Sequence, residues 1–332
     1  GQMWFCRTRD RRLTLFCEAR GFAEALRVHG QRELGPALDQ LHQQQRLDKQ
    51  RAWRMWGIGL GAALVLLVGG YFGIRQAGRA AIELLPHSAD EQIGKLAMGA
   101  MNLEGEVVTD PVLKSAVRSI VDRLSKSGTD GFRFEVRIVD ASIVNAFALP
   151  GGQIVVYTGL LRAAKSPEQV AGVLAHEMAH VTRRHGMQRI AQSVGVIALV
   201  QLLAGDVSGL AAVGIELVRD GAINSYSREQ ESEADTDGVE RMLRAQLDPR
   251  ALANFFEVLK SRELGLPTVA AWLGTHPDLG ERIANVRKQS VHFDTRRALP
   301  FSFSWTEVQR RAGALAETTP TTAPEPSKAK KP

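Results

Sequence analysis

An uninterrupted apolar run is the first clear signal in the pattern of hydrophobic and polar positions. Residues 55–74 contain no charged side chain, and these twenty residues at about 1.5 Å each would span about 30 Å, the hydrocarbon thickness of a bilayer. Trp53 and Trp56 lie at one end of the run and Tyr71 at the other, as an interfacial aromatic belt requires. A buried core helix is rarely apolar on all sides over this length. The pattern therefore predicts a membrane anchor over residues 53–75.

Basic residues are concentrated on the N-terminal side of this run. Four lie within residues 46–54, whereas only Arg75 and Arg79 closely follow the run. The positive-inside tendency then places the N-terminus in the cytoplasm and everything after residue 75 on the other side of the membrane. More than fifty residues precede the run, which argues against a cleaved signal peptide and favours an uncleaved anchor.

Downstream of the run, the periodicities predict an α+β fold that is mostly helical with a small β-sheet. Residues 110–127 carry apolar side chains at helical spacing and end before Gly128. Residues 132–139 alternate between apolar and polar side chains, as a half-buried strand does. Residues 145–149 and 153–157 are predicted to be two strands joined by a Pro-Gly-Gly turn.

The second half of the chain is predicted to be helical. Residues 190–205 and 210–218 are strongly apolar, which predicts a helical hairpin buried in the domain or resting on the membrane, with a re-entrant or spanning pair as the alternative. Further helices are expected over 227–244, 251–264 and 280–288. From residue 318 on, the composition of Thr, Pro, Ala and Lys is typical of a disordered tail.

Composition and charge exclude some classes of partner and of active site. The net charge is +6, but much of the excess lies in short runs at 7–12, 46–54 and 328–331, and no aromatic residues are interleaved with them in the way that nucleic-acid binding favours. We therefore expect no nucleic-acid partner. Cys6 and Cys17 lack zinc-knuckle spacing, and the remainder of the chain has no cysteine, which excludes a thiol nucleophile or a disulfide framework there.

Residues 176–180 read His-Glu-Met-Ala-His and are the strongest chemical signal. On a helix, His176 and His180 lie on one face, about one turn apart. Two neutral imidazoles in that relation can bind one Zn²⁺, and Glu177 can take a proton from a zinc-activated water. The alternative is a buried helix with two core histidines.

A helix-start signal precedes the motif and favours the metal-binding interpretation. Ser166 is a natural N-cap, Pro167 suits the first helical position, and Gln169 completes a capping box. Neither Gly nor Pro interrupts the following residues from 173 to 185. Val170, Val173 and Leu174 recur at helical spacing before the motif. Because the motif, the cap and this apolar face agree, a helix that carries a metal site is the preferred prediction.

A third ligand is expected from the acidic helix predicted at 227–244. Glu231 and Asp235 are four residues apart and share a face, while Glu233 and Asp237 share a different one. The residues alone leave the choice among these carboxylates open.

The small sheet just before the metal helix offers a place for a substrate. Zinc peptidases hold an extended substrate by strand addition to such a sheet, here at Asn145, Ala146, Phe147 and Ala148. The alternative is a hairpin that only packs the core.

Four sequence blocks together resemble one family: Asn145–Gly152, His176–His180, Ser227–Asp235 and Thr275–Pro277. In this order they are similar to the membrane-associated zinc endopeptidases that include the CAAX prenyl protease, HtpX and BepA, over about residues 83–290. The resemblance implies a zincin-like metallopeptidase domain of the gluzincin type with one Zn²⁺ per chain. It also implies protein or peptide substrates.

The resemblance assigns roles that the residues alone leave open. It implies that Glu231, rather than Glu233, is the third zinc ligand after His176 and His180. It implies that Asp235 supports these ligands by contacting them. It places His276 near the metal as a removable extra ligand, and the alternative for this residue is an oxyanion donor. Glu177 keeps the role of general base that the motif itself indicates.

Two departures from the family limit what is carried over. HtpX and the prenyl protease have several membrane spans where this chain has one predicted span, and BepA has helical repeats after its protease domain that are not seen here. We therefore expect a protein quality-control enzyme of the bacterial inner membrane, single-pass, with a periplasmic peptidase domain that cleaves misfolded or envelope proteins. The alternative is a zinc-containing chaperone or assembly factor of the envelope with a latched, weakly proteolytic site.

The expected organisation follows from these elements. It comprises a small basic cytoplasmic region at 1–52, the transmembrane anchor at 53–75, a zinc metallopeptidase domain at 80–295, a C-terminal extension at 296–317 and a disordered tail at 318–332. Glycine pairs at 57 and 61 and at 69 and 73 fit the small-residue pattern of membrane-helix pairing, so a homo-oligomer is a further expectation.

Overall fold

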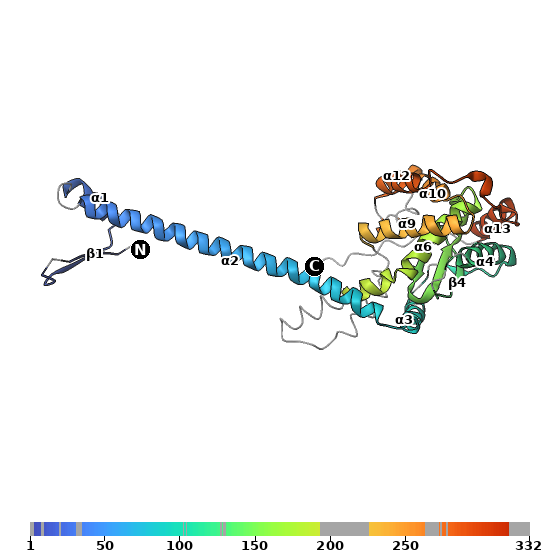
Figure 1. The fold of residues 1–332 in the computed structure, drawn as a ribbon, viewed down its shortest axis with the longest axis horizontal. Coiled ribbons are helices and arrows are strands. Elements are labelled where there is room, and N and C mark those ends of the chain that lie inside the picture. Colours follow the sequence, from blue (N-terminus) through green and yellow to red (C-terminus); the bar gives the residue numbers. More distant parts are fainter. Residues whose placement is uncertain are drawn as a thin grey trace. The chain divides into compact units, whose positions relative to one another are not determined.

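The computed structural model describes most of the chain. The described residues are 3–7, 10–19, 21–30, 35–101, 103, 105–126, 128, 131–192, 226–262, 272, 274–276 and 278–318. The chain divides into two compact units, Gly1–Gly73 and Ile74–Pro332 (Figure 1). The predicted hairpin at 190–205 and 210–218 lies almost entirely outside the described residues, as does nearly all of the predicted tail.

The first unit contains a two-stranded antiparallel sheet, a short helix and the greater part of a long one. The strands are β1 (Trp4–Arg7) and β2 (Thr14–Cys17), and the helices are α1 (Phe22–His29) and α2 (Gly35–Glu83). Within α2, the 31-residue stretch Gln43–Gly73 is long and apolar enough to cross a membrane by length and composition. Its large apolar side chains, such as Trp56 and Leu60, are exposed.

The second unit contains a mixed four-stranded sheet in the order β3-β4-β6-β5. The strands are β3 (Glu106–Val107), β4 (Glu135–Asp140), β5 (Ala146–Leu149) and β6 (Gln153–Tyr157). β4 and β6 are parallel, while β3 and β5 run antiparallel to their neighbours. Among the strands that the structure describes, β5 lies at the edge of the sheet, next to the helix that carries His176.

A short 3-10 turn, η1 (Pro150–Gly152), joins β5 to β6 and confirms the predicted Pro-Gly-Gly turn. Gly151 and Gly152 both have positive φ, 78° and 96°, which favours glycine. A Cβ on Gly151 would lie 2.4 Å from Glu91 Cα, and one on Gly152 would lie 2.1 Å from Arg133 O. The two glycines therefore allow helix α3 (His87–Ala100) and the chain before β4 to pack closely over the turn.

Helix α6 (Pro167–Thr182) lies at the centre of the unit, and every residue from Gln169 to Val181 is buried. It packs against β5 and against the helices that surround it in Figure 1, which are α4 (Pro111–Lys126), α9 (Arg228–Arg244) and α10 (Arg250–Arg262). At the α10 crossing, a Cβ on Gly172 would lie 2.9 Å from Leu252 Cα, so glycine allows the two backbones to approach. Helix α12 (Leu279–Gln289) packs on α9 and α10, while α5 (Thr158–Ala163) and α4 contact α13 (Trp305–Thr318).

The beginning of α6 differs from the predicted capping box. Ser166 is the N-cap residue, but its side chain makes no capping hydrogen bond. Gln169 Oε1 accepts instead from the Lys165 backbone N–H at 2.7 Å. A complete capping box is found at the start of α9, where the side chains of Ser227 and Gln230 each accept from the other residue's backbone N–H.

The end of α6 comes before residue 185, although neither Gly nor Pro interrupts the sequence up to that point. The helix ends at Thr182, and Arg184 adopts a positive φ of 55° before a new helix begins at residue 185. The Arg184 guanidinium pairs with the buried Asp90 carboxylate and donates to the carbonyl oxygens of Ile82 and Leu85. These contacts with a distant segment stabilise the backbone break at Arg184. The break in turn determines where His185 lies.

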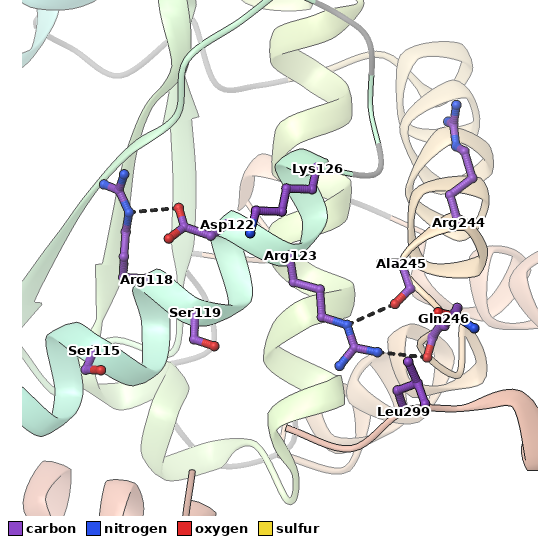
Figure 2. Close-up of a pocket in the computed structure, with 10 residues that line it drawn as sticks. All are labelled: Ser115, Arg118, Ser119, Asp122, Arg123, Lys126, Arg244, Ala245, Gln246 and Leu299. Carbon is purple, nitrogen blue, oxygen red and sulfur yellow. Dashed lines mark hydrogen bonds and ion pairs between the residues drawn. The ribbon is translucent and has the colours of Figure 1, made fainter. Parts of the chain in front are cut away.

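A cavity of about 600 Å³ lies between α4 and the C-terminal end of α9, the end opposite to the one that carries Glu231 (Figure 2). Arg123 in its wall donates to the carbonyl oxygens of Ala245 at 2.9 Å and Gln246 at 3.1 Å. Arginine here satisfies carbonyls that the end of α9 leaves without helical partners. We interpret this cavity as a structural junction between the two helices.

Candidate metal centre

Four side chains from separate parts of the second unit converge at one point. Potential ligand atoms from His176, His180, Glu231 and His276, one from each residue, all lie within 4.8 Å of one another, and all four residues are buried. His176 and His180 come from α6, Glu231 comes from α9, and His276 lies between α10 and α12. The structure thus brings together the four residues that sequence analysis singled out as ligands and as an extra ligand, in a cluster that could hold a metal ion.

The two histidines of α6 are oriented as their spacing predicts. Nε2 of His176 lies 3.1 Å from Nε2 of His180, so both rings present this nitrogen to the cluster. Glu231 lies opposite, with Oε2 3.6 Å from His176 Nε2 and Oε1 3.4 Å from His180 Nε2. Gly238 of α9 permits this proximity, because a Cβ there would lie 3.2 Å from the backbone nitrogen of His176.

Asp235 engages the other ring nitrogen of His176. Its Oδ1 lies 2.9 Å from His176 Nδ1. The same carboxylate receives two hydrogen bonds of 2.7 Å from Arg282 on α12, whose Nη1 also forms an ion pair with Glu231. Burial raises the pKa of Asp235, but Arg282 and His176 outweigh that effect, and the net pKa is lowered. Asp235 therefore stays ionised and accepts from the His176 ring.

Glu177 faces both the cluster and the sheet. Its Oε2 accepts from the Ala148 backbone N–H of β5 at 3.0 Å, and its Oε1 lies 3.4 Å from His276 Nε2. Among the described residues, no hydrogen-bond donor with good geometry reaches Oε1. Burial raises the pKa of Glu177, and the nearby histidines only partly offset this. One carboxylate oxygen is thus held by β5 while the other is directed toward the cluster.

Ring contacts hold His180 and His276. Tyr226 stacks on His180 with ring centroids 3.7 Å apart, and Trp272 stacks on His276 at 4.4 Å. Burial lowers the pKa of His180 well below its usual value, which leaves the neutral imidazole that can bind a metal. For His276, burial lowers the pKa as well, but the carboxylates of Glu231 and Glu177 more than offset it, and the net pKa is raised.

The predicted substrate strand lies beside Glu177. Asn145, Ala146, Phe147 and Ala148 are all buried, and the last three belong to β5. Asn145 O accepts from the Tyr157 N–H of β6, whereas Ala148 N–H is bonded to Glu177. Because hydrogen-bonding directions alternate along a strand, the backbone groups of Ala146 and Ala148 face away from β6. Asn145 Oδ1 is buried and has no hydrogen-bond partner among the described residues.

Sequence reasoning missed several residues that surround the cluster. Arg282 lies within a predicted helix, but a single arginine there gives no indication that it is buried against two acids. His185 follows two arginines shortly after the motif, and no local pattern indicates the backbone break that positions it. Tyr226 immediately precedes the N-cap of α9, and Trp272 is separated from His276 by one turn.

Comparison with known proteins identifies the class. The model of peptidase family M48 matches residues 109–290, and the chain belongs to this family of metalloendopeptidases. The family predicted from the four sequence blocks is thereby confirmed.

Individual relatives are known from mitochondria and bacteria. The chain is 32% identical over 165 residues to the mitochondrial metalloendopeptidase OMA1 of Schizosaccharomyces pombe. The aligned region covers 50% of this chain and 49% of the relative. It is 30% identical over 225 residues to the beta-barrel assembly-enhancing protease of Escherichia coli strain K12. Here the aligned region covers 64% of this chain and 46% of the relative. The chain spans about half the length of the curated relatives it matches.

The role of Arg282 leads to a stability prediction. Arg282→Met leaves the Asp235 and Glu231 carboxylates buried without their cation, and breaking a buried pair in this way typically costs about 3–5 kcal/mol. Arg287→Met on the same helix is the matched control, since its pair with Glu257 is half-exposed and such pairs contribute about 0–1 kcal/mol. Urea denaturation of the detergent-solubilised, chelator-treated chain measures both. Equal losses of unfolding free energy in the two variants would contradict this account of the cluster.

Proposed function

We propose that the chain is a zinc-dependent endopeptidase with a zincin-like domain, which cleaves peptide bonds in misfolded or envelope proteins. The observation that carries this proposal is the convergence of His176, His180 and Glu231 beside Glu177 at the edge of the sheet. Membership of family M48 supports it. The similarity to a protease named for beta-barrel assembly supports the envelope as the place of action.

The donor set fits zinc. Two imidazole nitrogens and one carboxylate are a ligand set of catalytic zinc sites, which keep a further position for water. Nε2 of both His176 and His180 faces the cluster, while Nδ1 of each ring is engaged on the opposite side. Arg282 offsets the charge of Glu231 and Asp235, so the buried acids need not all be neutralised by the ion.

The reaction follows from the positions of Glu177 and β5. When bound, zinc supplies a Lewis acid that lowers the pKa of water and polarises the scissile carbonyl. Glu177 Oε1 takes the proton of the attacking water and then passes it to the leaving amine, while the Ala148 N–H holds Oε2 in place. A pKa raised by burial brings this carboxylate closer to the pH at which a general base works best.

The edge of β5 is the proposed binding place for the substrate backbone. An extended peptide that pairs with the backbone N–H and C=O of Ala146 and with the C=O of Ala148 would add a strand to the sheet, while the Ala148 N–H stays bonded to Glu177. This pairing would place its scissile bond beside Glu177, which already contacts Ala148.

A second candidate function is favoured by the position of His276. Its Nδ1 lies 2.9 Å from Glu231 Oε1 and 3.3 Å from His176 Nε2, and its Nε2 is directed toward Glu177. As a fourth protein ligand, it would take the position that catalytic zinc keeps for water, and the same ring would engage the general base. A site latched in this way is the basis of the alternative, a zinc-containing chaperone or assembly factor with weak proteolysis.

The proposed membrane anchor determines on which side of the membrane the peptidase domain would act. The stretch Gln43–Gly73 has the length and composition of a membrane span. Its excess of basic residues on the N-terminal side favours a cytoplasmic N-terminus and a peptidase domain in the periplasm.

The role of Glu177 is tested by separating metal binding from cleavage. Glu177→Gln is expected to keep zinc and to lower casein cleavage by about 10²- to 10⁴-fold, the usual contribution of a general base. Glu231→Ala is expected to lose both zinc and activity, whereas Glu240→Ala, at an exposed position on the same helix, keeps both. Elemental analysis and a cleavage assay on purified protein measure these quantities. Wild-type activity in Glu177→Gln would refute the mechanism.

The latch is tested with His276→Ala. If His276 occupies the water position, the variant keeps zinc and cleaves an unstructured protein faster than wild type, with self-cleavage. Zinc content and the rate of casein cleavage are compared with those of His292→Ala, an exposed control. A folded, metallated but slower variant would assign His276 to stabilisation of the oxyanion. No change in either quantity would make the residue structural and remove the support for the second function.

The orientation is tested by fusing a reporter that is active only in the periplasm after residue 80, in a bacterial host. The charge difference across the anchor predicts an active fusion. A matched fusion with a reporter that is active only in the cytoplasm should be silent. The opposite result for this pair would show that the orientation is reversed.

A further inference from the structure

A histidine and a glutamate outside the four-residue cluster form a chain of contacts to His180. Nδ1 of His180 lies 2.9 Å from Nδ1 of His185, and Nε2 of His185 lies 3.0 Å from Oε2 of Glu233. His185 is fully buried, whereas the side chain of Glu233 is 33% exposed. The contacts therefore lead from the cluster, through a buried ring, to a carboxylate near the surface.

The backbone break after α6 creates this contact. A continuous helix would turn residue 185 away from residue 180, since five residues correspond to about 500° of rotation at 3.6 residues per turn. The positive φ of Arg184 ends that regularity and starts a new helix at His185. Arg184 is itself anchored by Asp90, so the position of His185 does not depend on the cluster.

The hydrogen positions of the three side chains follow from their order. His180 presents Nε2 to the cluster, so a neutral ring carries its proton on Nδ1 and needs an acceptor there. The lone pair on His185 Nδ1 is that acceptor. His185 then carries its own proton on Nε2, where the Glu233 carboxylate accepts it. Each donor thus has one acceptor, and the arrangement leaves Nε2 of His180 free for a metal.

His176 is held in a similar way, but without a second ring in between. The Asp235 carboxylate accepts directly from Nδ1 of His176. Metal-binding histidines almost always donate their second N–H to a carboxylate, carbonyl or water, and loss of that partner typically weakens metal binding about 10- to 100-fold.

We propose that His185 and Glu233 are positioning residues that fix the tautomer and orientation of His180 for metal binding. The inference rests on the proposed zinc site. It assigns a function to Glu233, which lies on a different face of α9 from Glu231 and Asp235. His185 carries the larger effect because it contacts His180 directly. Glu233 acts through His185 and is partly exposed, so its effect is smaller.

The test is the zinc affinity of the full-length chain in detergent, measured by competition with a chromophoric chelator. His185→Ala is expected to raise the zinc Kd about 10- to 100-fold. His185→Gln should recover most of the affinity, because its amide oxygen can accept from His180 and its amide nitrogen can donate to Glu233. Glu233→Gln should weaken binding less than His185→Ala does. His292→Ala and Glu240→Gln, at exposed positions, should match wild type.

The melting temperature of the metal-free protein separates positioning from folding. A positioning role predicts little change in this temperature, together with the loss of affinity and the rescue by glutamine. If wild type binds zinc, and the His185→Ala and Glu233→Gln variants both bind it as tightly as wild type does, the inference is overturned while the proposed function stands. If His185→Ala does not fold, Glu233→Gln decides, and unchanged affinity there overturns the inference. Failure of wild type to bind zinc would overturn the proposed function, and the inference with it.

Discussion

The burial of two carboxylates on one face of α9 is the constraint on which the rest of the site depends. Ionised Glu231 and Asp235 inside a protein are strongly unfavourable unless they are paired and hydrogen-bonded. Their partners include His176 from α6, Arg282 from α12 and, for Glu231, His276 from the segment between α10 and α12. Hydrogen-bond distances leave little freedom in how these three helices are arranged, and Gly238 allows the approach that the distances require.

The same helix connects this buried charge to the sheet. α6 carries the histidines that face α9, and it also carries Glu177, which contacts the edge strand β5 through Ala148. Metal binding and substrate binding are therefore proposed on two sides of one helix, in which every residue from Gln169 to Val181 is buried. Such a site is precise because its side chains are held by packing and by hydrogen bonds rather than by mobile loops. The match to family M48 agrees with this architecture.

Much of the fold and of the candidate site could be predicted from local patterns. The spacing of His176 and His180 determines that the two rings share a face once the segment is helical, and the same holds for Glu231 and Asp235. The Pro-Gly-Gly turn was predictable because positive φ strongly favours glycine. The choice of Glu231 over Glu233 came from the family resemblance, because both are acidic residues on one helix and differ only in the face they occupy.

By itself, then, the sequence determined the elements that carry the site and the side chains that each of them presents, since these depend on residues a few positions apart. The short elements β3 and α5 and the helix α13 were not predicted. The tertiary structure alone decided which elements meet. The break at Arg184 depends on Asp90, almost a hundred residues away, and this contact places His185 against His180. Arg282 is likewise a surface-type residue by local pattern, and it is buried because α12 packs where two carboxylates need a cation. Such pairings depend on contacts between distant residues, which no local periodicity encodes.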